Sequence, residues 1–132
     1  MRVFLDTNVL VSAVATRGIC ADILTLVLAE HQLVLGEQVL TELKRILVKK
    51  MKVSMEIAEE ADIFLRGQAA VVSSAEPHDI MIRDEDDIIV LGEAIAALAD
   101  VLVSGDKDLT AVAEEAPLQI LTPRGFWESL HG

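Results

Sequence analysis

The sequence has little of what disulfide-bonded, aromatic-rich or membrane-spanning proteins contain. It has one cysteine, Cys20, so no disulfide can form within the chain, and a reducing compartment, the cytoplasm, is expected. Aromatic residues make up 3% of the sequence, whereas 52% of it is apolar. Val, Leu, Ile and Ala must therefore fill the core. No apolar run reaches the roughly 20 residues that a membrane-spanning helix needs, so no membrane association is predicted.

Positive charge is also scarce. The chain carries 11 Lys and Arg against 22 Asp and Glu, for a formal net charge of −11. Proteins that bind nucleic acid usually present net positive charge. Net charge does not say where the acids lie, however. Either the excess acid keeps an acidic protein soluble, or some of the acids gather at one place where a divalent metal neutralises them.

The length of the chain fits one domain over residues 1–132. A domain this small and this apolar leaves apolar surface uncovered, which favours a homo-oligomer, such as a dimer, or a protein partner.

The order of predicted elements indicates an α/β fold. Short apolar runs predict five strands, at 2–5, 33–35, 70–73, 101–103 and 118–121. Helical periodicity predicts helices at 8–15, 21–29, 37–50, 55–67, 87–98 and 109–115, with a closing helix that starts at 122–123. Strands that alternate with helices favour a parallel sheet covered on both faces, a three-layer α/β/α arrangement. Ligands of such sheets bind beyond the carboxyl ends of the strands.

Acidic residues follow two of the predicted strands. Asp6 comes directly after the first strand, and Asp106 and Asp108 come just after the fourth. A buried carboxylate without a partner costs several kcal/mol, so Asp6 either caps the next helix or belongs to a site. Glu42 lies at the edge of the apolar stripe of the helix that follows the second strand.

A further group of acids stands at the start of the helix that leads to the fourth strand. Acids are favourable at a helix N-terminus, which explains one or two of Asp84, Glu85, Asp86 and Asp87 but not all of them. Asp87 begins an almost wholly apolar segment, so it is expected to point inward. Asp84 and Asp86 remain alternatives.

Taken together, these acids would repel one another unless a cation lay among them. Hard oxygen ligands select Mg²⁺ or Mn²⁺ rather than zinc. The zinc alternative finds no support, because Cys20 and the three histidines have no zinc-ligand spacing.

Arg45 and Lys49 form a basic strip on the same side as Glu42 of their helix, and Lys52 extends this strip if the helix continues that far. Two interpretations stay open for this strip. It is either a solvated face with charge pairs along the helix, or a surface that holds the phosphates of a nucleic acid near an acidic site.

Four stretches of the sequence together resemble the PIN-domain nucleases, including the toxin ribonucleases of bacterial toxin–antitoxin modules. They are FLDTNVLVSAV, VLTELKRIL, RDEDDIIVLGEA and ADVLVSGDKDL. The first and the last are specific in combination, and the resemblance extends over nearly the whole chain. It implies a PIN-like fold and a Mg²⁺- or Mn²⁺-dependent endoribonuclease that hydrolyses RNA phosphodiester bonds, with a cognate antitoxin as a possible protein partner.

The resemblance also implies roles for individual residues. The catalytic acids would be Asp6, Glu42, Asp87 and Asp106, and the metal ligands would be Asp6, Asp87, Asp106 and Asp108. Asn8 and Ser104 match polar supporting positions. RNA would be bound by Arg45, Lys49 and Lys52.

Two other classes of function remain alternatives. The DTN and GDKD stretches faintly resemble a haloacid-dehalogenase phosphatase with Asp6 as the nucleophile, but that family expects a second Asp where Asn8 stands. The other alternative is a non-catalytic domain that uses an acidic pocket for binding or as a scaffold.

Overall fold

A computed structural model describes residues 1–131 of the chain. Five parallel strands form one sheet in the order β3-β2-β1-β4-β5. Their bounds are β1 Arg2–Leu5, β2 Gln32–Gly36, β3 Ala70–Val72, β4 Val101–Val103 and β5 Gln119–Leu121. The helices are α1 Thr7–Ala15, α2 Ile19–Glu30, α3 Glu37–Lys49, α4 Met55–Gln68, α5 Glu85–Ala96, α6 Lys107–Thr110 and α7 Pro123–His131.

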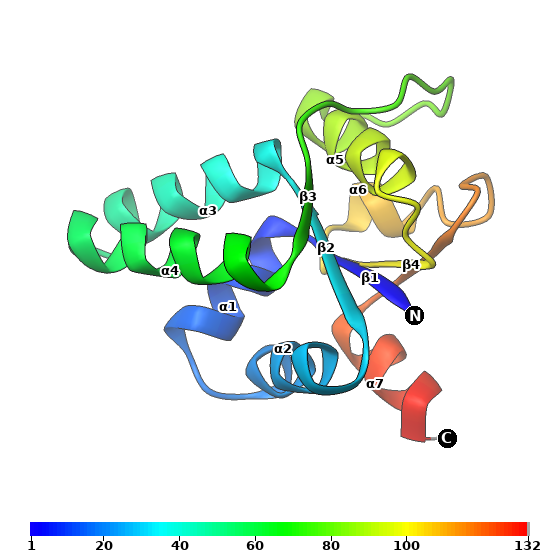
Figure 1. Cartoon of the computed structure of the whole chain (residues 1–132). Helices are drawn as coiled ribbons and strands as arrows, with labels where there is room; N and C mark the ends of the chain where they lie inside the picture. The colour runs from blue at the N-terminus through cyan, green and yellow to red at the C-terminus, as the bar shows by residue number, and fades with distance from the viewer. Residues whose placement is uncertain (132) are drawn as a thin grey trace.

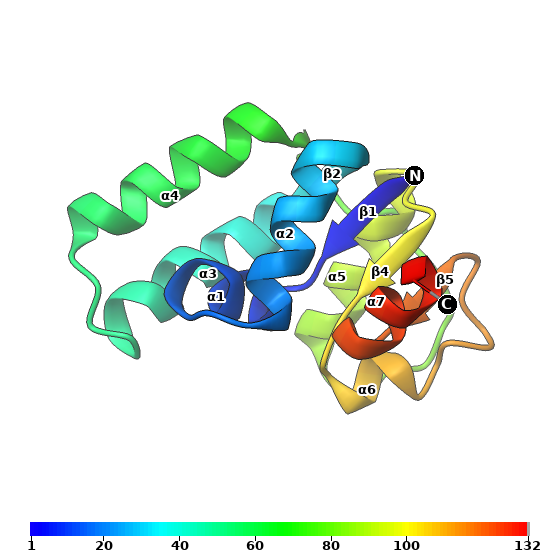
Figure 2. The same cartoon turned by 90° about the horizontal axis from the view of Figure 1, so that it is seen from below.

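Helices cover both faces of the sheet. Figure 1 shows α5 and α6 on one side of the strands, and α2 and α7 on the other, while α3 and α4 pack together beside the sheet. In Figure 2, α2 and α7 lie in front of β1 and β4, and α5 lies behind them. The predicted three-layer α/β/α architecture with a five-stranded parallel sheet is confirmed.

The middle of the sheet forms the core. Every residue of β4 is buried, as are all but the first residues of β1 and β2. This is the pattern of parallel strands that are covered on both faces. Aliphatic side chains dominate the core, as the scarcity of aromatics predicted, and Phe4 and Phe126 are the two fully buried rings among the described residues.

Most predicted helices have bounds within one or two residues of those observed, and two of the differences have a physical reason in the structure. The helix expected at 87–98 begins at Glu85, because the Asp84 side chain accepts a hydrogen bond from the Asp86 N–H at 2.8 Å and caps an earlier turn. The helix expected at 109–115 is wrong. A short helix, Lys107–Thr110, lies there instead, and the N–H of Val112 bonds only three residues back, to Leu109. Residues 111–115 therefore form turns rather than an α-helix.

Within residues 1–131, no single helix is long and apolar enough to cross a membrane. The helices α1 and α2 pass that test only when they are joined, by length and composition, and they are bent by 99° at the break between them.

Candidate functional site

The site lies at the point where the strand order reverses. The chain steps from β1 outward through β2 to β3 and then returns to place β4 against the other side of β1. Leu5 and Val103, the last residues of β1 and β4, are paired across the sheet. The residues that follow them therefore meet at one edge, in the crevice where open α/β sheets bind ligands.

Ser104 joins the two acids that follow these strands. Its side chain is fully buried. The hydroxyl donates to Asp6 Oδ2 at 2.6 Å, and Ser104 Oγ accepts from the Asp106 N–H at 2.9 Å. Ser104 thus holds the Asp6 carboxylate in one orientation and ties the loop that carries Asp106 to it.

Asp6 both caps the next helix and lines a cavity, the two possibilities that its position after the first strand left open. Its Oδ1 accepts from the Thr7 N–H at 2.7 Å, so Asp6 is the N-cap of α1, and it also lines a cavity with the other acids. Burial raises the pKa of Asp6, and the nearby Asp106 carboxylate raises it further, whereas the hydrogen bonds from Ser104 and Thr7 lower it. The carboxylate is thereby kept at a site that disfavours its charge.

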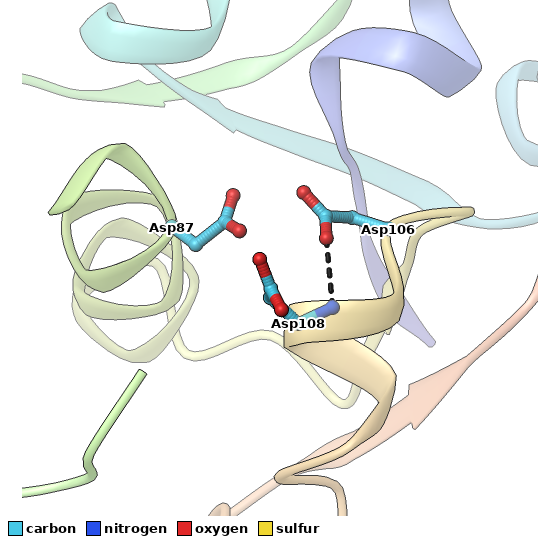
Figure 3. Close-up of side chains that lie close together, drawn as sticks. All are labelled: Asp87, Asp106 and Asp108. Carbon is cyan, nitrogen blue, oxygen red and sulfur yellow. Dashed lines mark hydrogen bonds between the residues drawn. The ribbon is translucent and has the colours of Figure 1, made fainter. Parts of the chain in front are cut away.

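Three carboxylates face one another beside this cap. Asp87, Asp106 and Asp108 each offer an oxygen, and these oxygens lie within 4.8 Å of one another. Figure 3 shows Asp87 pointing from α5 toward the two acids at the start of α6, and the Asp108 N–H donating to Asp106 Oδ1, at 2.8 Å. This oxygen-only group fits a hard divalent cation.

Asp87 is the buried member of the group. Its side chain is 6% exposed, and its Oδ2 is buried with no hydrogen-bond partner. Burial raises its pKa to about 8, and the Asp106 carboxylate adds to the increase. A buried, unpaired carboxylate oxygen that faces other carboxylates is the arrangement that a metal cation would satisfy.

A cavity of about 190 Å³ connects the candidate acids. Four of the sequence candidates line it, and they come from four separate parts of the chain: Asp6, Glu42, Asp87 and Asp106. The supporting candidate Asn8 lines it as well, and so do Asp84 and Asp86. Asp108 is not part of this lining, and it contributes to the carboxylate group from the side of α6.

The basic candidates lie elsewhere. Arg45 is bound to Glu42 through Nη2 and Oε2 at 2.9 Å, so this pair matches the charge-paired helix face. Arg45 and Lys49 line a groove of about 260 Å³ between α3 and α4, not the acidic cavity. Lys52 lies beyond the end of α3, in a left-handed backbone conformation with φ of 57°. The basic strip contacts the lining of the acidic cavity through one ion pair, between Arg45 and Glu42.

Sequence reasoning missed one buried acid that positions the site. Glu93 is 2% exposed, and its Oε2 accepts from the Gln38 N–H at 2.9 Å. Gln38 is in the first turn of α3, whose N-cap, Gly36, offers no side chain, so Glu93 on α5 satisfies the helix end from outside. A Cβ at Gly36 would overlap the Glu93 carboxylate. The available clue was a lone charge within the apolar run IIVLGEAIA.

Arg83 was also missed. Its Nη2 lies 3.6 Å from Asp108 Oδ2, and the side chain is 88% exposed. An exposed pair of this kind contributes little to stability, but it places a cation beside the carboxylate group. The clue in the sequence was its position directly before the acids at the start of α5.

Replacing Asp87 with Asn is expected to stabilise the metal-free protein at neutral and higher pH. The folded-state pKa of about 8 lies above the ordinary value of 3.8, so stability contributed by this group is present at low pH and is lost as pH rises through 8. The Asn side chain stays neutral, so the variant does not lose this stability as the pH rises. The gain near pH 8 should exceed about 1 kcal/mol, the equivalent of one pKa unit.

Urea unfolding in EDTA, at about pH 5 and about pH 8, measures this difference. The wild-type protein should lose more stability than Asp87→Asn between the two conditions. The same loss in both proteins would contradict the raised pKa of Asp87.

The fold and the site together define a class of α/β protein. In this class helices cover both faces of a parallel sheet, and carboxylates line a crevice where the strand order reverses, between β1 and β4. A family profile described as the PIN domain matches residues 2–108, and the chain belongs to the PIN-domain family. Members of this family are generally nucleases.

Solved structures agree on the fold. The chain is similar to a chain in the crystal structure of VapBC2 from Rickettsia felis bound to a DNA fragment from their promoter, with a TM-score of 0.64, 20% identity, and coverage of 92% of this chain and 98% of that one. It is also similar to VapBC-1 from nontypeable Haemophilus influenzae, with a TM-score of 0.64, 18% identity, and coverage of 94% and 99%. Among curated protein sequences, none matches significantly.

Proposed function

We propose that the protein is a Mg²⁺- or Mn²⁺-dependent endoribonuclease and the toxin of a toxin–antitoxin pair. The observation that carries the proposal is the group of Asp87, Asp106 and Asp108, with an unpaired buried oxygen on Asp87, at the switch point of a PIN-family sheet. Asp6 and Glu42 line the same cavity from the other side.

A bound divalent cation supplies a water of lowered pKa and stabilises negative charge on the phosphate. The chain's own residues prepare the place for it. Ser104 and the Thr7 N–H hold Asp6 rigid, and the Asp108 N–H orients Asp106. Because Asp87 is buried, its charged form depends on a cation nearby, so metal binding and ionisation of Asp87 would be coupled.

RNA would reach the cavity along α3, where basic residues lie outside the cavity. Arg45, Lys49 and Lys52 lie on and beyond α3, the helix that carries Glu42. Because the chain as a whole is acidic, with a net charge of −11, nonspecific binding should be weak. We therefore expect recognition to depend on the shape of a single-stranded or looped RNA rather than on overall charge.

A protein partner fits the exposed apolar surface. Met55, Ile57 and Phe64 on α4 are each more than half exposed, and Met55 also lines the groove between α3 and α4. The structural neighbours carry the name VapBC. An antitoxin or a second copy of the chain would cover these side chains, since exposed apolar area on small proteins commonly marks an interface.

The phosphatase alternative is disfavoured by the residue two positions after Asp6. A haloacid-dehalogenase site expects a second Asp there, and this chain has Asn8, which lines the acidic cavity without a carboxylate. The non-catalytic alternative predicts no cleavage of RNA with any metal, so the assay that follows separates it from the proposal.

Cleavage of single-stranded RNA by the purified protein tests the proposal. Activity is expected with Mn²⁺ or Mg²⁺, is expected to disappear in EDTA and should return when the metal is restored. Hydrolysis by water that expels the 3′-oxygen leaves 5′-phosphate and 3′-hydroxyl ends, whereas a histidine ribonuclease activates the 2′-hydroxyl and leaves a cyclic phosphate.

His78 is the histidine nearest the acids in the sequence, and its ring is already engaged. One ring nitrogen lies 3.0 Å from the carbonyl of Ile88, and the other accepts from the Ile80 N–H at 3.2 Å. His78 does not line the acidic cavity. Cyclic phosphate ends, or cleavage that survives EDTA, would overturn the metal-dependent proposal.

A further inference from the structure

A second cavity opens beside the acidic one and shares a wall with it. Its volume is about 280 Å³. It is lined by Asn8, Val9, Ser12, Cys20, Gly105 and Pro123, and we call it the neutral cavity because no charged side chain lines it. Asn8 lines both cavities. The neutral cavity and the acidic cavity therefore adjoin at Asn8.

The walls of the neutral cavity continue directly from the acidic site. Asn8 and Ser12 lie one turn apart on α1, the helix that Asp6 caps. Gly105 stands immediately before Asp106 in the loop that Ser104 anchors. A Cβ built at Gly105 would meet Asn8 Nδ2 at 3.7 Å, so Gly105 lies beside the side chain that lines both cavities. A chain bound across the acids would pass the mouth of the neutral cavity.

The lining has the composition of a site for a flat, polar, uncharged ring. Val9 is buried and Pro123 is half-buried, and both offer apolar surface. The amide of Asn8 and the hydroxyl of Ser12 can both donate and accept hydrogen bonds. A cavity of about 150 Å³ holds a benzene ring, so the larger volume found here accommodates a nucleobase. Bases of single-stranded RNA are recognised when they are splayed out of the stack into such sites.

We propose that the neutral cavity binds the base of the nucleotide next to the phosphate at which RNA is cut. The proposal rests on the proposed function and adds to it a subsite outside the carboxylate cluster. The acids would act on the phosphate, which has no base-specific feature, while the neutral cavity would hold the neighbouring base. Selection among RNA sites would then depend on Asn8, Ser12 and Cys20 more than on the acids.

Filling the cavity tests the proposal. Ser12→Leu places a larger apolar side chain in it, and Ala15→Leu, at the exposed end of the same helix, makes a comparable change outside it. We expect Ser12→Leu to raise KM for a short single-stranded RNA about tenfold, with a smaller change in kcat, because the base contributes mainly to binding. Ala15→Leu should leave both values unchanged. Circular dichroism shows whether each variant is folded.

Substrates that lack one base give the sharper readout. In the wild-type protein, an abasic nucleotide beside the cut site should raise KM about tenfold, and abasic nucleotides further away should have less effect. In Ser12→Leu the same abasic nucleotide should cause no further rise in KM, because the base no longer binds in the filled cavity. Equal KM values for Ser12→Leu and Ala15→Leu, or the same abasic penalty in wild type and Ser12→Leu, would overturn the proposal. If Ser12→Leu loses self-association while its KM is unchanged, the proposal is also overturned, and the cavity would instead be a contact with a second copy of the chain.

Alkylation of Cys20 separates failure of this proposal from failure of the proposed function. Cys20 is the single cysteine of the chain and is half-buried in the cavity wall. In the wild-type protein with Mg²⁺, single-stranded RNA should slow the reaction of Cys20 with iodoacetamide at least threefold, whether or not the RNA is cut. If no RNA is cleaved and Cys20 is still protected, the proposed function fails and the base site stands. If Cys20 is not protected, the base site is overturned. This measurement uses the wild-type protein, so it is decisive even if Ser12→Leu does not fold.

Discussion

Replacing Asp6 with Asn is expected to lower the rate of RNA cleavage by more than about 100-fold while the protein stays folded. Even outer-shell residues of metal sites cost 10–100-fold when they are changed, and Asp6 lines the cavity itself. Asn keeps the cap of α1, because its side-chain oxygen can accept from the Thr7 N–H as Asp6 does at 2.7 Å. What is lost is the negative charge, together with the acceptor for the Ser104 hydroxyl, because the amide nitrogen of Asn donates where Asp6 Oδ2 accepts.

The matched control is Asp100→Asn. Asp100 is exposed and precedes β4, at the opposite end of the strand from the acidic site, and its Oδ2 accepts from the Arg2 N–H at 2.7 Å. Both substitutions remove one negative charge and one carboxylate that binds a backbone N–H. Cleavage should be unchanged in Asp100→Asn. Full activity in a folded Asp6→Asn protein would contradict the assignment of the site.

The largest effect on stability is expected from Arg66→Met. Arg66 Nε donates to Asp62 Oδ2 at 2.9 Å, and its other nitrogens bind both oxygens of Glu37, at 2.7 and 2.8 Å. Asp62 is 7% exposed, and its Oδ1 has no partner. Without Arg66, the nearest cation to this buried carboxylate is Lys44, at 3.8 Å.

Loss of one partner from a buried ion pair costs 3–5 kcal/mol. Arg66 is 38% exposed, so about 2 kcal/mol is the expected loss in free energy of unfolding by urea. Arg124→Met should cost less than about 0.5 kcal/mol, because Arg124 and Glu128 form an exposed pair. Adding Asp62→Asn to Arg66→Met should recover part of the loss, since the unpaired charge is removed. Equal effects at Arg66 and Arg124 would show that the Asp62 pair carries no special weight.

This ion pair also bears on the site. Glu37 and Glu42 are on α3, and Arg66 binds α3 to α4 through Glu37. Glu93 fixes the other side of the same helix start through the Gln38 N–H. The position of Glu42 at the cavity thus depends on Glu37, Arg66 and Glu93, none of which lines the cavity.

The local patterns of the sequence were sufficient for the architecture. Alternation of short aliphatic runs with helical periods predicted the parallel sheet and its helices, because burial on both faces demands apolar strands. The same reasoning placed Asp6 and Asp106 beyond strand ends, where the structure has them on either side of the switch point. Their chemical roles stay predictions.

Local patterns were not sufficient where a neighbour far along the chain decides the outcome. Asp62 and Glu93 have the sequence context of ordinary helix residues, yet both are buried. Asp62 lies 3.8 Å from Lys44 of α3, and Glu93 binds the start of that same helix. The pairing of Arg45 with Glu42, rather than with the open cavity, depends on side-chain geometry that helical spacing allows but does not select. The end of α6 at Thr110 likewise follows from turn geometry.

By itself, then, the sequence determined which segments are strands and helices and which acids follow the strands, since those depend on residues near one another in the chain. Only the tertiary structure decided that Asp87, rather than Asp84 or Asp86, is the buried acid at the start of α5, and that a neutral cavity adjoins the acidic one at Asn8. The reason is physical: burial and shared cavities arise when elements distant in sequence pack together, and no local periodicity encodes the distance between them.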